Sequence, residues 1–220
     1  MAKAFPNTGA TVIDSVADLP AASADLEGVM VFQRDSNELK ICDGSSWVSM
    51  LNTDNPGALQ LIATNSFSSA SSTQFLNKFS STYTNYRVLL NATDGSTSTS
   101  MMLRFLASNN TPLSGGYYGG GYKVSWTGSG SPDWQNNASS GFVGQGGTSP
   151  ALLASLDILN PFVPSNTGYN VFSTTNGNVI YGSYYSGFHN NASAVYGVEF
   201  YPSTGTITGT ASLYGYRNTI

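Results

Sequence analysis

Residues 169–185 read YNVFSTTNGNVIYGSYY and carry the clearest fold signal in this chain of 220 residues. Two runs rich in β-branched and aromatic residues flank Asn176-Gly177, the pair that type I′ turns favour between antiparallel strands. The stretch therefore predicts a β-hairpin. Neighbouring segments repeat its period of two.

Apolar residues alternate with polar ones in several further segments of the chain. This pattern is typical of an antiparallel sheet that covers a core with one face. About eight such strands predict an all-β fold whose main part is an antiparallel, jelly-roll-like β-sandwich. The residues expected to face inward are Tyr86, Val88, Leu90, Leu103, Phe105, Leu152, Ala154, Leu156, Ile158, Tyr196, Val198, Phe200, Ile207, Gly209, Ala211 and Leu213.

Charge divides the chain into two parts. Residues 1–54 hold eight acidic and three basic residues, a net charge of −5, whereas residues 55–220 hold four acidic and five basic residues, a net charge of +1. Only 9% of all residues are charged, far below the roughly 25% of typical soluble domains. We expect an N-terminal unit over 1–54 and a larger, nearly neutral body over 55–220.

The N-terminal part predicts a small β-meander. Apolar runs at 29–33, 38–42 and 47–51 are separated by polar turns, the second of which is Asp43-Gly44. Residues 1–11 are expected to form an extended arm, and Pro20 blocks a long helix. Because so few strands bury little apolar surface, we expect this unit to need stabilising contacts with the body, with other copies or with a partner.

The composition offers few groups for catalysis or for binding metals and nucleic acid. Cys42 is the only cysteine and His189 the only histidine, which excludes an intrachain disulfide and a typical zinc site. A calcium site of Asp and Asn oxygens stays open, although no loop has the EF-hand pattern. Lysine and arginine are too sparse to neutralise a row of phosphates. We expect no cofactor, no metal, no nucleic acid and no insertion into a membrane, because no apolar run has the necessary length.

Residues 112–150 interrupt the strand rhythm with many glycines and serines, and we expect a long aromatic loop there. Aromatic side chains on such loops offer stiff, amphipathic contact area, and rings beside polar groups could stack on a sugar. Alternatively, the same rings pack the loop onto the sandwich or fill a subunit interface. The candidate glycan-binding residues are Tyr117, Tyr118, Tyr122, Trp126, Asp133 and Trp134.

Two parts of the chain resemble proteins of tailed-bacteriophage particles. In residues 12–50, the segments DLP (18–20), GVMVF (28–32) and NELKICDGSSW (37–47) resemble a pattern of phage fibre proteins. The C-terminal stretch GTITGTASLYGYR (205–217) is similar to the ending of many phage appendage sandwiches. The segments YTNYRV (83–88) and LRF (103–105) also fit that group.

The resemblance implies a structural, non-enzymatic protein of the virion, assembled in the host cytoplasm, with a jelly-roll body and often trimeric. We expect a tail fibre or host-recognition appendage that docks by its N-terminal segment. A capsid decoration protein is the alternative, followed by a glycan-cleaving depolymerase or a cellular lectin-like module. Candidate contacts within a homotrimer or with the particle are Phe5, Trp47, Tyr214 and Tyr216.

Overall fold

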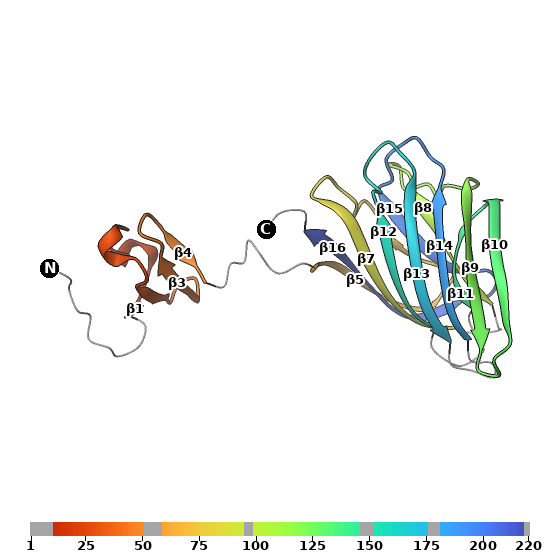
Figure 1. Ribbon diagram of the computed structural model, residues 1–220, viewed down its shortest axis with the longest axis horizontal. Coiled ribbons are helices and arrows are strands. Elements are labelled where there is room, and N and C mark those ends of the chain that lie inside the picture. Colours follow the sequence, from red (N-terminus) through yellow and green to blue (C-terminus); the bar gives the residue numbers. More distant parts are fainter. Residues whose placement is uncertain (1–10, 51–58, 95–98, 146–151, 176–180, 218–220) are drawn as a thin grey trace. The chain divides into compact units, whose positions relative to one another are not determined.

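The computed structural model describes residues 11–50, 59–94, 99–145, 152–175 and 181–217 (Figure 1). The described residues form strands, turns and two short 3₁₀ helices, with no α-helix among them, so the predicted all-β class is confirmed. The chain divides into two compact units, Met1–Pro56 and Gly57–Ile220. We call them the head and the body. The predicted linker at residues 52–57 lies outside the described residues.

The head contains one four-stranded sheet in the order β1-β2-β3-β4. The expected meander is present as β2 (Met30–Gln33), β3 (Glu38–Cys42) and β4 (Trp47–Ser49). A fourth strand, β1 (Thr11–Ile13), pairs in parallel with β2, so the end of the expected arm joins the sheet. Two 3₁₀ helices, η1 (Val16–Asp18) and η2 (Ala24–Leu26), lie on either side of Pro20.

Several acidic side chains of the head hold its own turns together. Asp43 accepts hydrogen bonds from the backbone amides of Ser45 and Ser46, at 2.9 and 2.7 Å. These bonds favour the carboxylate and hold the pKa of Asp43 well below its usual range. Asp18 accepts a bond from the Ser15 amide at the start of η1. Part of the acidity of the head therefore has a local structural role.

The body consists of two sheets packed face to face. Eight of its strands have a jelly-roll arrangement, with β5-β16-β7-β12 in one layer and β6-β15-β8-β11 in the other. The larger layer lies in front in Figure 1, with β8, β11 and β15 behind it. The bounds of these strands are β5 Leu59–Ala70, β6 Thr73–Phe75, β7 Tyr83–Asp94, β8 Ser100–Leu106, β11 Gly141–Gln145, β12 Leu152–Leu159, β15 Gly197–Pro202 and β16 Ile207–Arg217.

Two hairpins extend the larger layer to eight strands. One is β9 (Tyr117–Ser125) with β10 (Gly130–Ala138), and the other is β13 (Thr167–Thr175) with β14 (Tyr181–His189). The second is the hairpin predicted from residues 169–185, and its strand pairing is confirmed, while its turn at 176–180 lies outside the described residues. Because β14 also pairs with β9, the full order is β10-β9-β14-β13-β12-β7-β16-β5.

The prediction of a long loop at 112–150 is wrong. This segment contains β9, β10 and β11, and only residues 146–150 of it lie outside the described part of the chain. Its glycines allow rings and backbone to approach closely: a Cβ atom on Gly119 or Gly121 would lie 2.8 Å from the ring of Tyr185. Glycine content therefore reflects rings packed over the strands in this hairpin.

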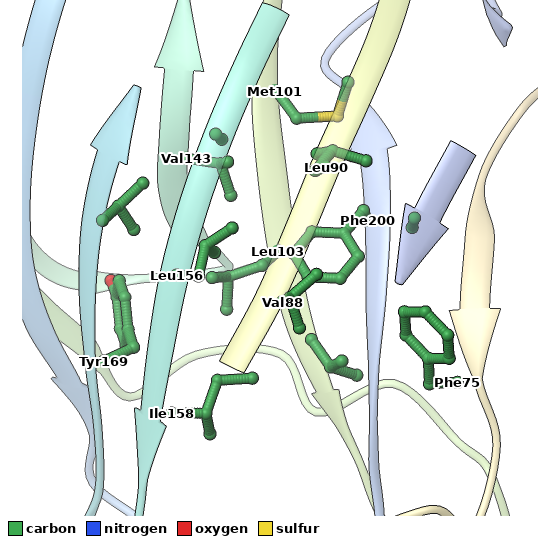
Figure 2. Packing of buried hydrophobic residues seen from close by; sticks show 14 of the residues in the cluster. Phe75, Val88, Leu90, Met101, Leu103, Val143, Leu156, Ile158, Tyr169 and Phe200 are labelled. Carbon is green, nitrogen blue, oxygen red and sulfur yellow. The ribbon is translucent and has the colours of Figure 1, made fainter. Parts of the chain in front are cut away.

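The core lies between the two sheets and matches the predicted inward rows closely (Figure 2). Side chains from β7, β12 and β13 meet those of β8, β11 and β15, and Leu103, Leu156 and Phe200 are fully buried at the centre. Tyr196 is only partly buried, and it packs against Phe162 outside this centre. Among the described residues, no helix has the length and apolar character that crossing a membrane requires.

Candidate functional site

Exposed apolar side chains gather on the outer face of the eight-stranded sheet. The strand β12 shows why: Leu152, Ala154 and Leu156 point into the core, which places Leu153 on the opposite face, 51% exposed. A contiguous apolar face on a single chain usually marks a contact surface. The large apolar side chains exposed on this face are Leu59, Leu61, Leu89, Tyr122, Val124, Trp134, Leu153, Phe172, Tyr184 and Phe188.

Strand register aligns three of these rings in one row. Tyr122 on β9 lies opposite Tyr184 on β14, which in turn lies opposite Phe172 on β13. The row continues through Ser155 on β12 to Leu89 on β7. We call these five residues the transverse row. Phe172 is 68% exposed and Tyr184 56% exposed, so the rings stand above the sheet surface.

A hollow of about 670 Å³ opens where the transverse row crosses the middle of the sheet. Its lining includes the apolar side chains of Leu89, Leu153 and Phe172, and nothing lies within 4 Å of the position that a Cβ atom on Gly182 would take. Its size falls within the range of small-molecule sites. The hollow and the row together form the candidate site.

One ion pair lies beside the transverse row on the same face. Arg87 on β7 donates two hydrogen bonds of 2.8 Å to the carboxylate of Asp157 on β12. The hydroxyl of Tyr216 donates to the same carboxylate at 2.7 Å. Arg87 holds the pKa of Asp157 below its usual value, with Tyr216 helping and partial burial opposing. The pair ties β7, β12 and β16 together on the outer surface.

We expect the Asp157→Asn variant to lower the free energy of unfolding by about 1–2 kcal/mol at pH 7, because it removes a bidentate charge pair that is only partly exposed. Since folding lowers the pKa of Asp157, its contribution is present at neutral pH and is lost as the pH falls below about 4. Urea titrations at pH 7 and pH 3 measure both values. The Tyr216→Phe variant keeps the ion pair, so its free energy of unfolding should fall by less. If Asp157→Asn lowered the free energy of unfolding by the same amount at pH 3 as at pH 7, this assignment would be contradicted.

Four of the six candidate residues from 112–150 lie on the outer face of the sheet or in a turn, and three of these four are exposed. Tyr122 belongs to the transverse row, and Trp134 on β10 is 73% exposed on the same face. Tyr118 stacks on Phe188 with ring centroids 5.4 Å apart. Trp126 lies in the turn between β9 and β10, away from the row, and is 70% exposed.

The other two candidates, Tyr117 and Asp133, do not lie on this surface. Tyr117 is fully buried: its hydroxyl donates to the carbonyl of Leu113 and accepts from the amide of Phe105. Burial raises the pKa of Tyr117 far above its ordinary value. Asp133 alternates with Trp134 and so faces the inner side of β10. Its charge contributes to a raised pKa of Tyr185, although burial is the larger cause. Asp133 and Trp134 therefore cannot share one sugar.

Only some of the residues proposed for subunit or particle contacts lie on the outer face of the sheet. Tyr214 and Tyr216 lie on the outer face as expected, but the hydroxyl of Tyr216 is already used by Asp157. Trp47 is partly buried within the head, where its indole donates to the carbonyl of Pro20 at 2.8 Å. Phe5 lies outside the described residues. The partly exposed rings of Tyr214 and Tyr216 remain the contact candidates of the body.

The described titratable residues of the body are dispersed, and four of its charged side chains form two ion pairs. Glu199 on β15 is buried between Arg104 and Gln74, on the other sheet from Asp157. His189 packs against Tyr117 with ring centroids 4.5 Å apart, and burial lowers its pKa. No group of three or more His, Cys, Asp or Glu side chains with metal-binding geometry occurs within the described ranges.

Two of the three rings in the transverse row, Phe172 and Tyr184, were not among the predicted site residues. Phe172 and Tyr184 belong to the predicted hairpin, for which the sequence analysis assigned no inward or outward face. Counting large residues on the solvent side of each predicted strand could have found them. Their alignment across three strands needed the register, which depends on the pairing of β14 with β9.

Comparisons with known proteins add no identification. No family model matches the chain, and no curated protein and no solved structure is significantly similar to it.

Proposed function

We propose that the chain is a non-enzymatic structural protein of a tailed-phage particle, most closely a tail fibre or host-recognition appendage. In this proposal the head attaches the protein to the particle, and the body presents the outer face of the eight-stranded sheet. The observation that carries it is the exposed apolar and aromatic face of that sheet. A surface of this kind serves binding rather than proton transfer.

The charged residues of the body support a contact role. Arg87 pairs with Asp157 and Arg104 pairs with Glu199, so these four charges neutralise each other locally. A glycosidase needs two carboxyl groups about 5–10 Å apart on opposite sides of one bond. Asp157, Glu199 and Asp133 instead lie on different faces of the two sheets. This arrangement favours binding over cleavage.

The division of the chain supports separate attachment and contact parts. The head forms a compact unit with its own sheet, and it carries most of the acidic residues. Its sequence also carries the resemblance to phage fibre proteins. A body with so little net charge suits close packing of several copies, since little repulsion separates them. We therefore include a homotrimer in the proposal.

Immunogold labelling of purified particles tests this proposal directly. We expect gold on the tail, and light scattering of the full-length protein should give the mass of three chains. Gold on the capsid faces would replace the appendage with a decoration protein. Absence of the protein from particles would overturn the virion role and favour a cellular lectin-like module. Shortened host polysaccharide after incubation with the protein would overturn the non-enzymatic part.

A further inference from the structure

The hollow on the outer sheet face is uncharged. Its polar lining comes from hydroxyl and amide side chains, with Asn91 on β7, Ser155 on β12 and Ser212 on β16 among them. The nearest charges across these strands, Arg87 and Asp157, are paired with each other. A charged ligand would therefore lose its hydration here without gaining an opposite charge. The lining fits a neutral ligand with many hydroxyl groups.

Three rings on successive strands lead from the hollow toward the edge of the sheet. Phe172 lies at its wall, and Tyr184 and Tyr122 continue outward on the next two strands. Neighbouring strands lie about 4.8 Å apart, so the transverse row from Tyr122 to Leu89 spans about 19 Å. A single sugar ring is too short to use this length, whereas an extended chain of sugars can contact all of it.

We propose that this face binds a neutral oligosaccharide, which lies along the transverse row and places one unit in the hollow. The apolar faces of its rings stack on Phe172, Tyr184 and Tyr122. Its hydroxyl groups exchange hydrogen bonds with the hydroxyl and amide side chains of the hollow. This inference deepens the proposed host-recognition function by naming the chemistry of the ligand and its position on the body.

A second copy of this chain fits the hollow less well. Sheet-to-sheet packing would cover Asn91 and Ser155 with the exposed apolar side chains of the second copy. Each covered polar group without a partner destabilises such an interface. The open space next to Gly182 would also stay unfilled beneath a flat partner surface, and van der Waals contacts would be lost there. A ligand that carries its own hydroxyl groups and enters the hollow avoids both costs.

Binding of the full-length protein to an array of defined oligosaccharides tests the proposal. We expect binding to neutral hexose and N-acetylhexosamine oligomers and little binding to hexuronic acid oligomers of equal length. The Phe172→Ala and Tyr184→Ala variants should each weaken binding at least about tenfold. Trp126→Ala is the matched control, because its ring is equally exposed but lies off the row. It should leave binding unchanged.

The Gly182→Leu variant provides a second test that does not remove a ring. Its side chain enters open space in the hollow, so the fold should persist while binding is lost. Loss of binding with an unchanged thermal midpoint supports the site. Binding that survives both Phe172→Ala and Gly182→Leu, or no binding to any neutral oligomer, overturns it. So does a full-length oligomer that dissociates on Tyr184→Ala, which would make this face a subunit interface.

This result is separable from particle labelling. Neutral oligosaccharide binding without gold on particles would keep the site and reject the virion role. Gold on the tail without oligosaccharide binding would keep the virion role and reject the oligosaccharide site.

Discussion

The Phe105→Ala variant is expected to lower the free energy of unfolding by about 3–5 kcal/mol. Phe105 on β8 is fully buried between the sheets, and its ring lies about 6 Å from the rings of Tyr117, Tyr169 and His189. Alanine would leave a cavity with rigid walls, because all three of these rings belong to paired strands, β9, β13 and β14. Equilibrium urea unfolding, followed by tyrosine and tryptophan fluorescence, measures the loss.

Phe172→Ala is the matched control for this prediction. The same ring is removed, but Phe172 is 68% exposed on the outer sheet face, so little buried contact is lost. We expect a change within about 0.5 kcal/mol. Similar losses for the two variants would contradict the assignment of Phe105 to the inner face of the smaller sheet and of Phe172 to the outer face of the larger one. The pair therefore tests the orientation of β8 and β13 as well as the core.

The Gly121→Ala variant is expected to destabilise the body by about 3 kcal/mol, although alanine normally suits a strand better than glycine. A Cβ atom on Gly121 would lie 2.2 Å from the carbonyl oxygen of Tyr184 and 2.8 Å from the ring of Tyr185. Backbone atoms of a paired strand cannot move aside without breaking the pairing of β9 with β14. Chemical denaturation measures the difference.

Gly182→Ala is the control for this prediction, because Gly182 lies on β14, the strand that pairs with the β9 strand of Gly121. Nothing lies within 4 Å of the added Cβ atom, so we expect a stability within about 0.5 kcal/mol of the native protein. A stable Gly121→Ala variant would mean that the β9–β10 hairpin does not pack beneath Tyr185. That result would return residues 112–145 to the loop expected from their composition.

The local sequence pattern was sufficient to predict the strands that have one apolar face. The rows of Val88 with Leu90 and of Leu156 with Ile158 are buried as predicted, because alternation directly reports which face covers a core. The pattern was insufficient for β9 and β10. The inner positions of β9 include Gly119 and Gly121, which make room for the ring of Tyr185 on β14, and those of β10 include Asp133 and Gln135. No apolar alternation therefore marks these segments as strands.

The candidate site depended even more on distant pairing. Tyr122 and Trp134 were expected to bind ligand because of their ring chemistry, and both lie on the exposed face. Tyr117 and Asp133 were grouped with them by proximity in sequence. Alternation of side chains along a strand separates such neighbours onto opposite faces, and the segment was not recognised as strands. The structure therefore separates Tyr122 and Trp134 on the exposed face from Tyr117 and Asp133 on the inner side.

By itself, the sequence determined the all-β class and most of the buried rows, because period-two alternation is a local property. Only the tertiary structure decided that two hairpins far apart in sequence pair through β9 and β14. That pairing brings Tyr122, Tyr184 and Phe172 into one row beside a hollow. The physical reason is that strand register depends on contacts between segments about 60 residues apart, which no local pattern encodes.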